Sequence, residues 1–164
     1  MIRRNFLKAG VAAVGAVALG RKAADAAEGK FPVSHTEAEW KKLLSPDQYA
    51  VLRQEATERP FSSPLNANKK AGVYNCAGCD TAVYSSETKF ESGTGWPSFW
   101  APISSEAVGT TTDYKLIYPR TEVHCATCGG HLGHVFDDGP KPTGKRHCIN
   151  GVALKFNPGA AQAS

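Results

Sequence analysis

Cys76-Ala77-Gly78-Cys79 and Cys125-Ala126-Thr127-Cys128 are the two C-x2-C pairs that decide how this chain folds. The two sulfurs of such a tight turn can reach one ion, and two turns supply the four thiolates of a tetrahedral zinc site. Because 45 residues separate the pairs, the metal ties together strands that lie far apart in the sequence. The spacing therefore predicts a closed structural zinc site with no open position for a substrate. Its ligands are Cys76, Cys79, Cys125 and Cys128.

Disulfide bonds are the alternative for these four cysteines. The N-terminal residues, described below, read as an export signal, and an exported protein meets an oxidising compartment. A disulfide within a C-x2-C pair is typically redox-active and staples little structure, so zinc is the favoured interpretation. A thiol–disulfide oxidoreductase that uses the two pairs is a competing function. Such an enzyme would hold no stoichiometric zinc, and the chain lacks the βαβ pattern of thioredoxin-like proteins.

The pattern around the cysteine pairs predicts a mainly β domain preceded by two short helices. Two capping boxes, Thr36 to Glu39 and Ser45 to Gln48, each predict the start of a helix, the second with a proline at its first position. After residue 72, short alternating runs separated by Gly, Pro, Asn and Asp predict antiparallel strands joined by tight turns. The expected strands cover residues 72–74, 82–84, 114–118, 122–124, 134–136 and 149–156.

Residues 1–26 read as an export signal rather than as part of the fold. A basic start with paired arginines, Arg3-Arg4, precedes a weakly apolar run of about 12 residues and the small-residue site Ala24-Asp25-Ala26. The start resembles the twin-arginine type, which predicts a periplasmic location in a bacterium. An uncleaved amphipathic tail or anchor is the alternative. The expected organisation continues with a polar lead at 27–35, one domain at 36–157 and a tail at 158–164.

The charge balance argues against a nucleic-acid partner. The full chain has 164 residues and a formal net charge of +4, but the signal carries five of the 19 basic residues and one of the 15 acids. The remainder therefore has 14 of each and no net charge, whereas a nucleic-acid binder normally keeps a basic face. The chain also lacks the run of about 20 apolar residues that spans a bilayer, so we expect no membrane span after signal removal.

The fifth cysteine, Cys148, is the candidate nucleophile. Its setting is Lys145-Arg146-His147-Cys148-Ile149-Asn150, and cationic neighbours lower the pKa of a thiol. In a strand, residues 146, 148 and 150 share one face, so Arg146 and Asn150 flank the sulfur while His147 points away. A buried inert cysteine is the alternative.

Two further stretches are candidates for the site. His131-Leu132-Gly133-His134 offers two imidazoles that could move protons, although solvated or core histidines are the simpler interpretation of this pattern alone. Gly93-Thr94-Gly95-Trp96-Pro97-Ser98-Phe99-Trp100 is rich in aromatic residues, which either fill the core or form the wall of an apolar pocket.

Taken together, these segments resemble the B-type methionine sulfoxide reductases, which act on the R epimer of the sulfoxide. The similarity covers about residues 36–157. The matching segments are Tyr74 to Cys79, Lys89 to Phe99, Cys125 to Cys128, His131 to Pro140 and Arg146 to Asn150. The resemblance implies a small antiparallel fold of two β-sheets with peripheral helices, and a zinc ion held by the four paired cysteines.

The resemblance also implies a role for each candidate residue. Cys148 is the expected nucleophile, Trp96 packs the substrate's methyl group, and Arg146 favours the thiolate. His131, His134 and Asn150 line the sulfoxide pocket. Attack on the sulfoxide sulfur, with a histidine supplying the proton, would release methionine and leave Cys148 as a sulfenic acid.

One departure from the family concerns how the enzyme is recycled. Many relatives have a resolving cysteine where this chain has Thr94. We therefore expect an external reductant: a thioredoxin- or glutaredoxin-like protein, or a small thiol. Gly151 and His147 also differ from the commoner family residues, which are Ser or Ala, and Tyr.

The expected substrate is methionine-R-sulfoxide in oxidised proteins, and the expected oligomeric state is a monomer. A noncatalytic, zinc-held module that recognises an oxidised or methylated side chain is the remaining alternative, and it would not need Cys148.

Overall fold

The computed structural model describes residues 31–116 and 118–159. The expected export signal at 1–26 lies outside the described residues, as do residues 27–30 of the lead and 160–164 of the tail. Two helices come first, and nine strands and one short 3-10 helix follow. Among the described helices, none combines the length and apolar character that crossing a membrane requires.

Both predicted capping boxes are confirmed. In α1 (Glu37–Leu43) the Thr36 side chain accepts a hydrogen bond from the Glu39 backbone N–H, and Glu39 bonds back to the Thr36 backbone. Ser45 and Gln48 make the same reciprocal pair at the start of α2 (Pro46–Gln54). Because these bonds satisfy N–H groups that have no partner inside the helix, local sequence alone fixes where each helix begins.

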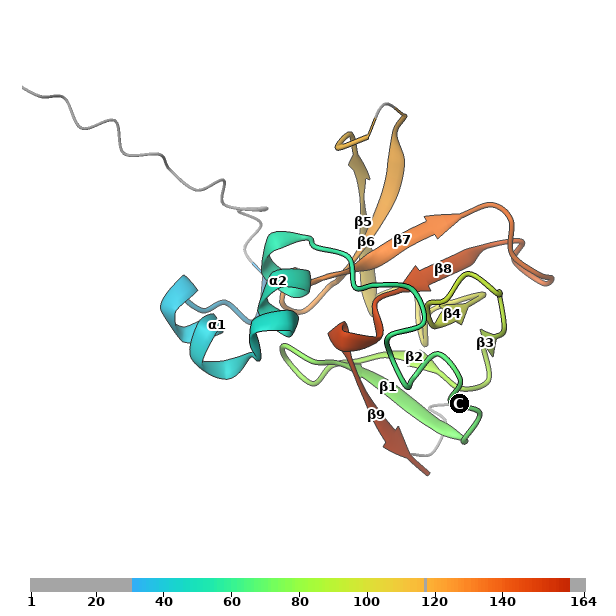
Figure 1. Cartoon of the computed structure of the whole chain (residues 1–164), viewed down its shortest axis with the longest axis horizontal. Helices are drawn as coiled ribbons and strands as arrows, with labels where there is room; N and C mark the ends of the chain where they lie inside the picture. Colours follow the sequence, from blue (N-terminus) through green and yellow to red (C-terminus); the bar gives the residue numbers. More distant parts are fainter. Residues whose placement is uncertain (1–30, 117, 160–164) are drawn as a thin grey trace, which may run out of the picture.

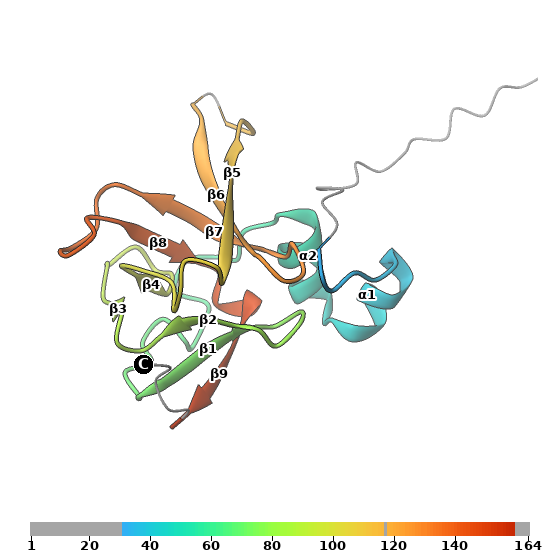
Figure 2. The same cartoon turned by 180° about the vertical axis from the view of Figure 1, so that it is seen from behind.

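The strands form two antiparallel sheets (Figures 1 and 2), which confirms the expected fold class. The smaller sheet has the order β2-β1-β9, and the larger one has the order β3-β4-β8-β7-β6-β5. The smaller sheet contains β1 (Gly72–Cys76), β2 (Ala82–Ser85) and β9 (Leu154–Pro158). The larger contains β3 (Lys89–Phe90), β4 (Ser98–Phe99), β5 (Val108–Asp113), β6 (Arg120–Cys125), β7 (His131–Phe136) and β8 (Arg146–Ile149).

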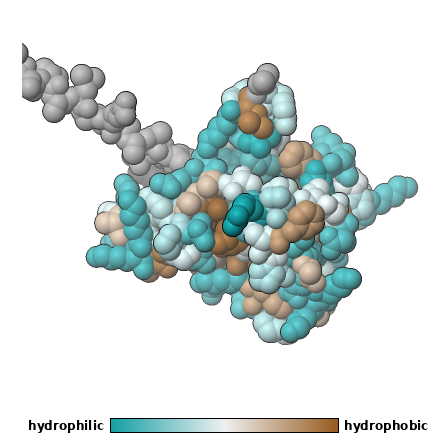
Figure 3. Space-filling model, viewed as in Figure 1, coloured by the Kyte–Doolittle hydropathy of each residue, from teal (hydrophilic) through white to brown (hydrophobic). Residues whose placement is uncertain are grey.

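The strand predicted at residues 114–118 is wrong. The strand of this region is β5, and the predicted segment is part of the connection to β6, at the tip of a hairpin that projects from the body (Figure 1). Tyr114, Leu116 and Tyr118 are exposed there, and hydrophobic surface is visible at the tip in Figure 3. The alternating pattern gave a false strand prediction because apolar residues alternate in this connection. The threonine-rich β5, in contrast, has little hydrophobic contrast between its faces.

The single run predicted at residues 149–156 is also divided. The chain leaves the larger sheet at Ile149, passes through the 3-10 helix η1 (Gly151–Ala153), and enters the smaller sheet as β9. This crossing places Asn150 at the junction of the two sheets, next to the end of the strand that carries Cys148.

The core joins the two sheets through aromatic side chains. Tyr74 of β1, Tyr84 of β2 and Phe99 of β4 are all fully buried. The Phe99 ring stacks on Tyr84 at 4.4 Å between centroids and meets Tyr74 edge-on at 5.0 Å. Within the aromatic stretch 93–100, Phe99 therefore belongs to the core, which leaves Trp96 available for another role.

Candidate active site and metal centre

The four paired cysteines meet at one point. Their ligand atoms all lie within 4.8 Å of one another, and two short sulfur–sulfur distances join the different pairs. Cys76 Sγ lies 3.7 Å from Cys128 Sγ, and Cys79 Sγ lies 3.6 Å from Cys125 Sγ. None of the five cysteines, all of which lie within the described ranges, forms a disulfide.

This geometry fits a metal ion. Four sulfurs bound tetrahedrally at about 2.3 Å from zinc lie about 3.8 Å apart, close to the two short distances here. Without a cation, four thiolates in so small a volume would repel one another strongly. The residues present therefore form a closed four-thiolate metal site.

The two cysteine turns have the same backbone geometry. In each, the residue after the second cysteine donates its N–H to the carbonyl of the first cysteine, Asp80 to Cys76 and Gly129 to Cys125. Both Asp80 and Gly129 have positive φ, at 63° and 66°. At Gly129 a Cβ atom would also lie 2.3 Å from the Phe31 ring, so glycine is required there for space as well as for backbone conformation.

Cys148 opens into a separate pocket of about 130 Å³. The side chain lies on β8, where its register partners are His134 on β7 and Ser98 on β4. Directly opposed residues of an antiparallel pair share a face, so His134 and Cys148 lie on the same side of the sheet. The pocket is lined by Thr57, Trp96, Arg120, Gly133, His134, Phe136, Cys148 and Asn150.

A β-bulge brings the second histidine to the same face. His131 and His134 are three residues apart, which in a regular strand would place them on opposite faces. Val123 pairs with Gly133, but His124 pairs with His131, so β7 has one extra residue at this point. The bulge reverses the alternation, and the two imidazole rings lie 5.4 Å apart between centroids.

The pocket histidine, His134, is held by a carboxylate. Its Nε2 lies 2.8 Å from Asp113 Oδ2, which also accepts a hydrogen bond of 2.6 Å from Arg120 Nη2. Burial lowers the pKa of His134 more than the Asp113 carboxylate raises it, so the imidazole is neutral at rest. The pKa of Asp113 lies well below its usual range because the Lys115 N–H, His134 and Arg120 outweigh burial.

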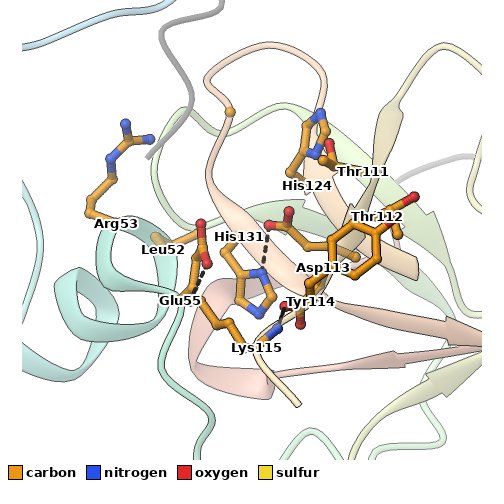
Figure 4. A pocket seen from close by; sticks show the side chains of 12 residues that line it. Leu52, Arg53, Glu55, Thr111, Thr112, Asp113, Tyr114, Lys115, His124 and His131 are labelled. Atoms are coloured by element: carbon orange, nitrogen blue, oxygen red, sulfur yellow. Dashed lines mark hydrogen bonds and ion pairs between the residues drawn. The ribbon is translucent and has the colours of Figure 1, made fainter. Parts of the chain in front are cut away.

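His131 belongs to a different cavity. Its Nδ1 lies 2.8 Å from Glu122 Oε1, and its side chain is only 3% exposed. It helps to line a cavity of about 490 Å³ between α2 and the β5–β6 hairpin, where an ion pair joins Glu55 to Lys115 (Figure 4). Among the described residues, no partner bonds to the buried Nε2 atom of His131. His134, and not His131, therefore lines the Cys148 pocket.

Arg146 lies beside the nucleophile with its charge already paired. Its Nε and Nη2 atoms donate to the two carboxylate oxygens of Asp138 at 2.8 and 2.9 Å, and its guanidinium lies over the Phe136 ring at 4.5 Å. Burial raises the pKa of Cys148 above its ordinary value, although Thr94 and Arg146 lower it. The expected lowering of the Cys148 pKa by a cationic neighbour is therefore present at Arg146, but desolvation of the thiolate is the larger effect.

Asn150 and Trp96 are tied to one another through Glu58. The Asn150 side chain accepts from the Glu58 N–H at 3.0 Å and donates to the Leu132 carbonyl at 3.0 Å. The Trp96 indole N–H donates to the Glu58 carbonyl at 3.1 Å. The Glu58 carboxylate accepts the N–H groups of Gly151 and Val152 at 2.6 and 2.9 Å. One loop residue thus fixes the pocket wall.

The glycine at position 151 has a local cause. A Cβ atom there would lie 2.0 Å from the Ser63 hydroxyl oxygen and 3.3 Å from Glu58 Oε1. A serine or alanine at 151 would therefore require Ser63 to move.

The sequence analysis expected Cys148, His134, Asn150 and Trp96 in one pocket, and all four line the pocket described above. It named none of the charged residues that hold the candidate site residues. These are Glu58, Asp113, Arg120, Glu122 and Asp138. The available signal was weak. Glu122 lies on the strand predicted at residues 122–124, but this pattern names no partner for it, and Arg120 lies outside every predicted strand.

Comparison with known proteins agrees with this geometry. A model of the SelR domain matches residues 44–158. Peptide methionine sulfoxide reductase MsrB of Methanosarcina barkeri is 60% identical over 124 residues, which are 76% of this chain and 87% of that protein. The proteins of the same name from Pseudomonas putida and Leptospira interrogans are 52% and 49% identical over 126 residues, which are 77% of this chain and 95% and 96% of theirs. This chain therefore belongs to the SelR domain family.

Proposed function

We propose that this protein is a peptide-methionine (R)-S-oxide reductase, which reduces methionine-R-sulfoxide to methionine with Cys148 as the nucleophile. The observation that carries the proposal is the pocket itself. It places a partly exposed thiol beside an indole ring and a neutral imidazole. These are the groups needed to attack sulfur, to pack a methyl group and to move a proton.

The reaction requires the thiol and the imidazole together, because a sulfoxide sulfur is a poor electrophile until its oxygen is protonated. Neutral His134 accepts the Cys148 proton and passes it to the sulfoxide oxygen as the Cys148 sulfur attacks the substrate sulfur. The attack forms a bond between the two sulfurs. This S–S bond and the S–O bond of the substrate then break as the protonated oxygen transfers to the Cys148 sulfur, and methionine leaves. Two electrons pass from the thiol sulfur to the methionine sulfur, and Cys148 becomes a sulfenic acid, Cys-SOH.

The remaining pocket residues orient the substrate. Trp96, held by its indole N–H, presents its ring to the methyl group and so helps to select the R epimer. Asn150 positions the wall, because both ends of its amide are already bonded to backbone groups. Arg146 stabilises negative charge on the Cys148 sulfur, while Asp138 fixes its guanidinium plane.

Separate assays with the R and S epimers test this function. With dithiothreitol as reductant, the protein reduces the R epimer and leaves the S epimer untouched. Cys148→Ser, an isosteric change, abolishes turnover while the circular dichroism spectrum and the metal content stay those of the parent. Retention of R-sulfoxide reduction by this variant contradicts the proposal.

An external thiol regenerates the enzyme. With Cys76, Cys79, Cys125 and Cys128 at the metal site, no second thiol in the described residues is left to resolve the sulfenic acid. A thioredoxin- or glutaredoxin-like protein, or a small thiol, attacks Cys-SOH and releases water. A second reductant thiol then restores Cys148 and leaves with the first as a disulfide. After one turnover without reductant, dimedone labels Cys148, and an internal disulfide found instead overturns this scheme.

The metal is zinc, on the chemistry of the donor set. Four thiolates with no open position favour a tetrahedral ion without redox chemistry, which holds the fold together and takes no part in the reaction. Elemental analysis of the purified protein tests this, with one zinc per chain expected. Iron at the same stoichiometry contradicts it.

The N-terminal residues support export to the periplasm. Arg3-Arg4, the short apolar run and Ala24-Asp25-Ala26 follow the order of a twin-arginine signal. Cell fractionation tests this, with Arg3→Lys combined with Arg4→Lys as the variant expected to stay in the cytoplasm. The mature protein is a monomer, which light scattering coupled to size exclusion tests.

A further inference from the structure

A row of hydroxyl groups ends at the Cys148 sulfur. Thr94 Oγ1 lies 3.8 Å from Cys148 Sγ and 2.8 Å from Ser92 Oγ. Ser92 Oγ lies 2.7 Å from Ser98 Oγ, and the Ser98 hydroxyl donates to the Trp96 carbonyl at 3.1 Å. Ser98 is fully buried and is the register partner of Cys148 across β4 and β8, so the row is fixed to the same sheet as the nucleophile.

The direction of these bonds follows from counting protons. Each hydroxyl has one hydrogen to donate and two lone pairs to accept. Because Ser98 uses its hydrogen on the Trp96 carbonyl, Ser92 must donate to Ser98, and Thr94 must donate to Ser92. The hydrogen in the last contact then belongs to the Cys148 thiol, which donates to Thr94. In this direction the row suits a protonated sulfur.

The same heavy atoms suit the ionised sulfur when the direction reverses. Rotation about the C–O bonds lets Thr94 donate to the thiolate, Ser92 to Thr94, and Ser98 to Ser92. The reversal costs the bond from Ser98 to the Trp96 carbonyl, and it gains a charge-assisted bond at the sulfur. Hydrogen bonds in a row polarise one another, so the far hydroxyls strengthen the donor that meets the sulfur.

The cations around the Cys148 sulfur are already paired with carboxylates, so a neutral hydroxyl donor can add to the stabilisation of the thiolate. Arg146, on the same strand, is bound to Asp138. Across the pocket, His134 on β7 and Arg120 on β6 share the carboxylate of Asp113, at the end of β5. His147 lies on the opposite face of β8, and β4 presents Ser98, which is uncharged. Each nearby cation is therefore paired with a carboxylate.

We propose that Thr94, Ser92 and Ser98 form a reversible hydrogen-bond chain that holds Cys148 as a thiol at rest and stabilises the thiolate at the moment of attack. The inference rests on the proposed function, in which Cys148 is the nucleophile. Thr94 is then a catalytic residue, since it touches the reacting atom, and Ser92 and Ser98 are positioning residues that act through it.

Alkylation of Cys148 as a function of pH tests the chain. The zinc-loaded protein is treated with iodoacetamide, and mass spectrometry of the Cys148 peptide separates this thiol from the metal ligands. Thr94→Val, which keeps the shape and removes the donor, raises the apparent pKa of Cys148 by about one unit and slows alkylation about tenfold below that pKa. Thr94→Ser restores both values, and Ser98→Ala gives a smaller shift in the same direction.

Activity measurements complete the test. Thr94→Val lowers kcat for the R epimer about tenfold and leaves KM unchanged, because the hydroxyl acts on the sulfur and not on substrate binding. Thr143→Val is the matched control, since it makes the same substitution at a threonine whose hydroxyl donates to the Trp100 carbonyl at the exposed surface. This control changes neither the alkylation profile nor kcat.

The outcomes separate the two proposals. If Thr94→Val leaves both the alkylation pKa and kcat at the parent values while Cys148→Ser is inactive, the hydroxyl chain is refuted and the proposed function stands. If Thr94→Ser fails to rescue the valine variant, the effect is one of packing and the chain is likewise refuted. If Cys148→Ser keeps its activity, the nucleophile is wrong and both proposals fail.

Discussion

His147 makes the stability of the fold sensitive to acid. It lies on β8 on the face opposite Cys148 and is only 8% exposed, and its Nδ1 lies 3.1 Å from the hydroxyl of fully buried Tyr84. Burial and, to a smaller extent, the positive charge of Lys145 lower the pKa of His147 from 6.5 to about 4. At neutral pH the imidazole is therefore uncharged, and its Nδ1 shares a hydrogen bond with the Tyr84 hydroxyl.

The sign of the effect follows from which state binds the proton. In the unfolded chain His147 takes up a proton below pH 6.5, whereas in the folded protein it does so only near pH 4. Its contribution to stability is therefore fully present above pH 6.5 and is lost as the pH falls towards 4. Each pH unit in this window costs about 1.4 kcal/mol, so acidification from pH 7.5 to pH 5 removes about 2 kcal/mol through this residue.

Urea unfolding of the parent and of His147→Phe, followed by tryptophan fluorescence, measures this contribution. The variant leaves the buried Tyr84 hydroxyl without its partner, which costs about 1–3 kcal/mol at every pH. Only the parent has a histidine to protonate at this position, so its advantage over the variant shrinks by about 2 kcal/mol between pH 7.5 and pH 5. The other histidines and the metal ligands titrate in both proteins and cancel in the comparison.

A constant difference in unfolding free energy across this pH range would refute the reasoning. That result would mean that His147 is protonated in the fold as readily as in the unfolded chain. A difference that widens on acidification would reverse the sign and show that the folded protein prefers the charged imidazole.

Three further changes test other parts of the structure. Phe99→Ala empties the aromatic centre of the core and lowers the free energy of unfolding by about 3–5 kcal/mol, measured by denaturant titration. A loss below about 1 kcal/mol contradicts the assigned packing. Cys76→Ser removes one of four ligands, so bound zinc falls and the Tm drops, and a variant that keeps full zinc and the parent Tm argues against the site. Asp113→Asn frees the imidazole of His134 and lowers kcat at least tenfold with a smaller effect on KM, measured by steady-state kinetics. An unchanged kcat excludes the role of Asp113 in positioning His134.

Much of the fold was predictable because its signals are local. The two capping boxes fix where the helices begin, and the alternating runs at 72–74, 82–84, 122–124 and 134–136 all lie within strands of the structure. Two signals failed for a physical reason. Residues 114–118 alternate in hydrophobicity but occupy an exposed connection, and β5, with its run of threonines, pairs mainly through its backbone with β6.

The sequence by itself determined the candidate residues: two cysteine turns for a metal site, one further cysteine as the expected nucleophile, and a histidine and a tryptophan expected near it. Only the tertiary structure decided which groups orient those residues and set their protonation. The β7 bulge, the bonds of Asp113 and Glu58, and the pairing of Arg146 with Asp138 join segments that the sequence does not relate. Sequence spacing reports neighbours along one strand, whereas the protonation of a thiol depends on burial and on charges that arrive from other strands.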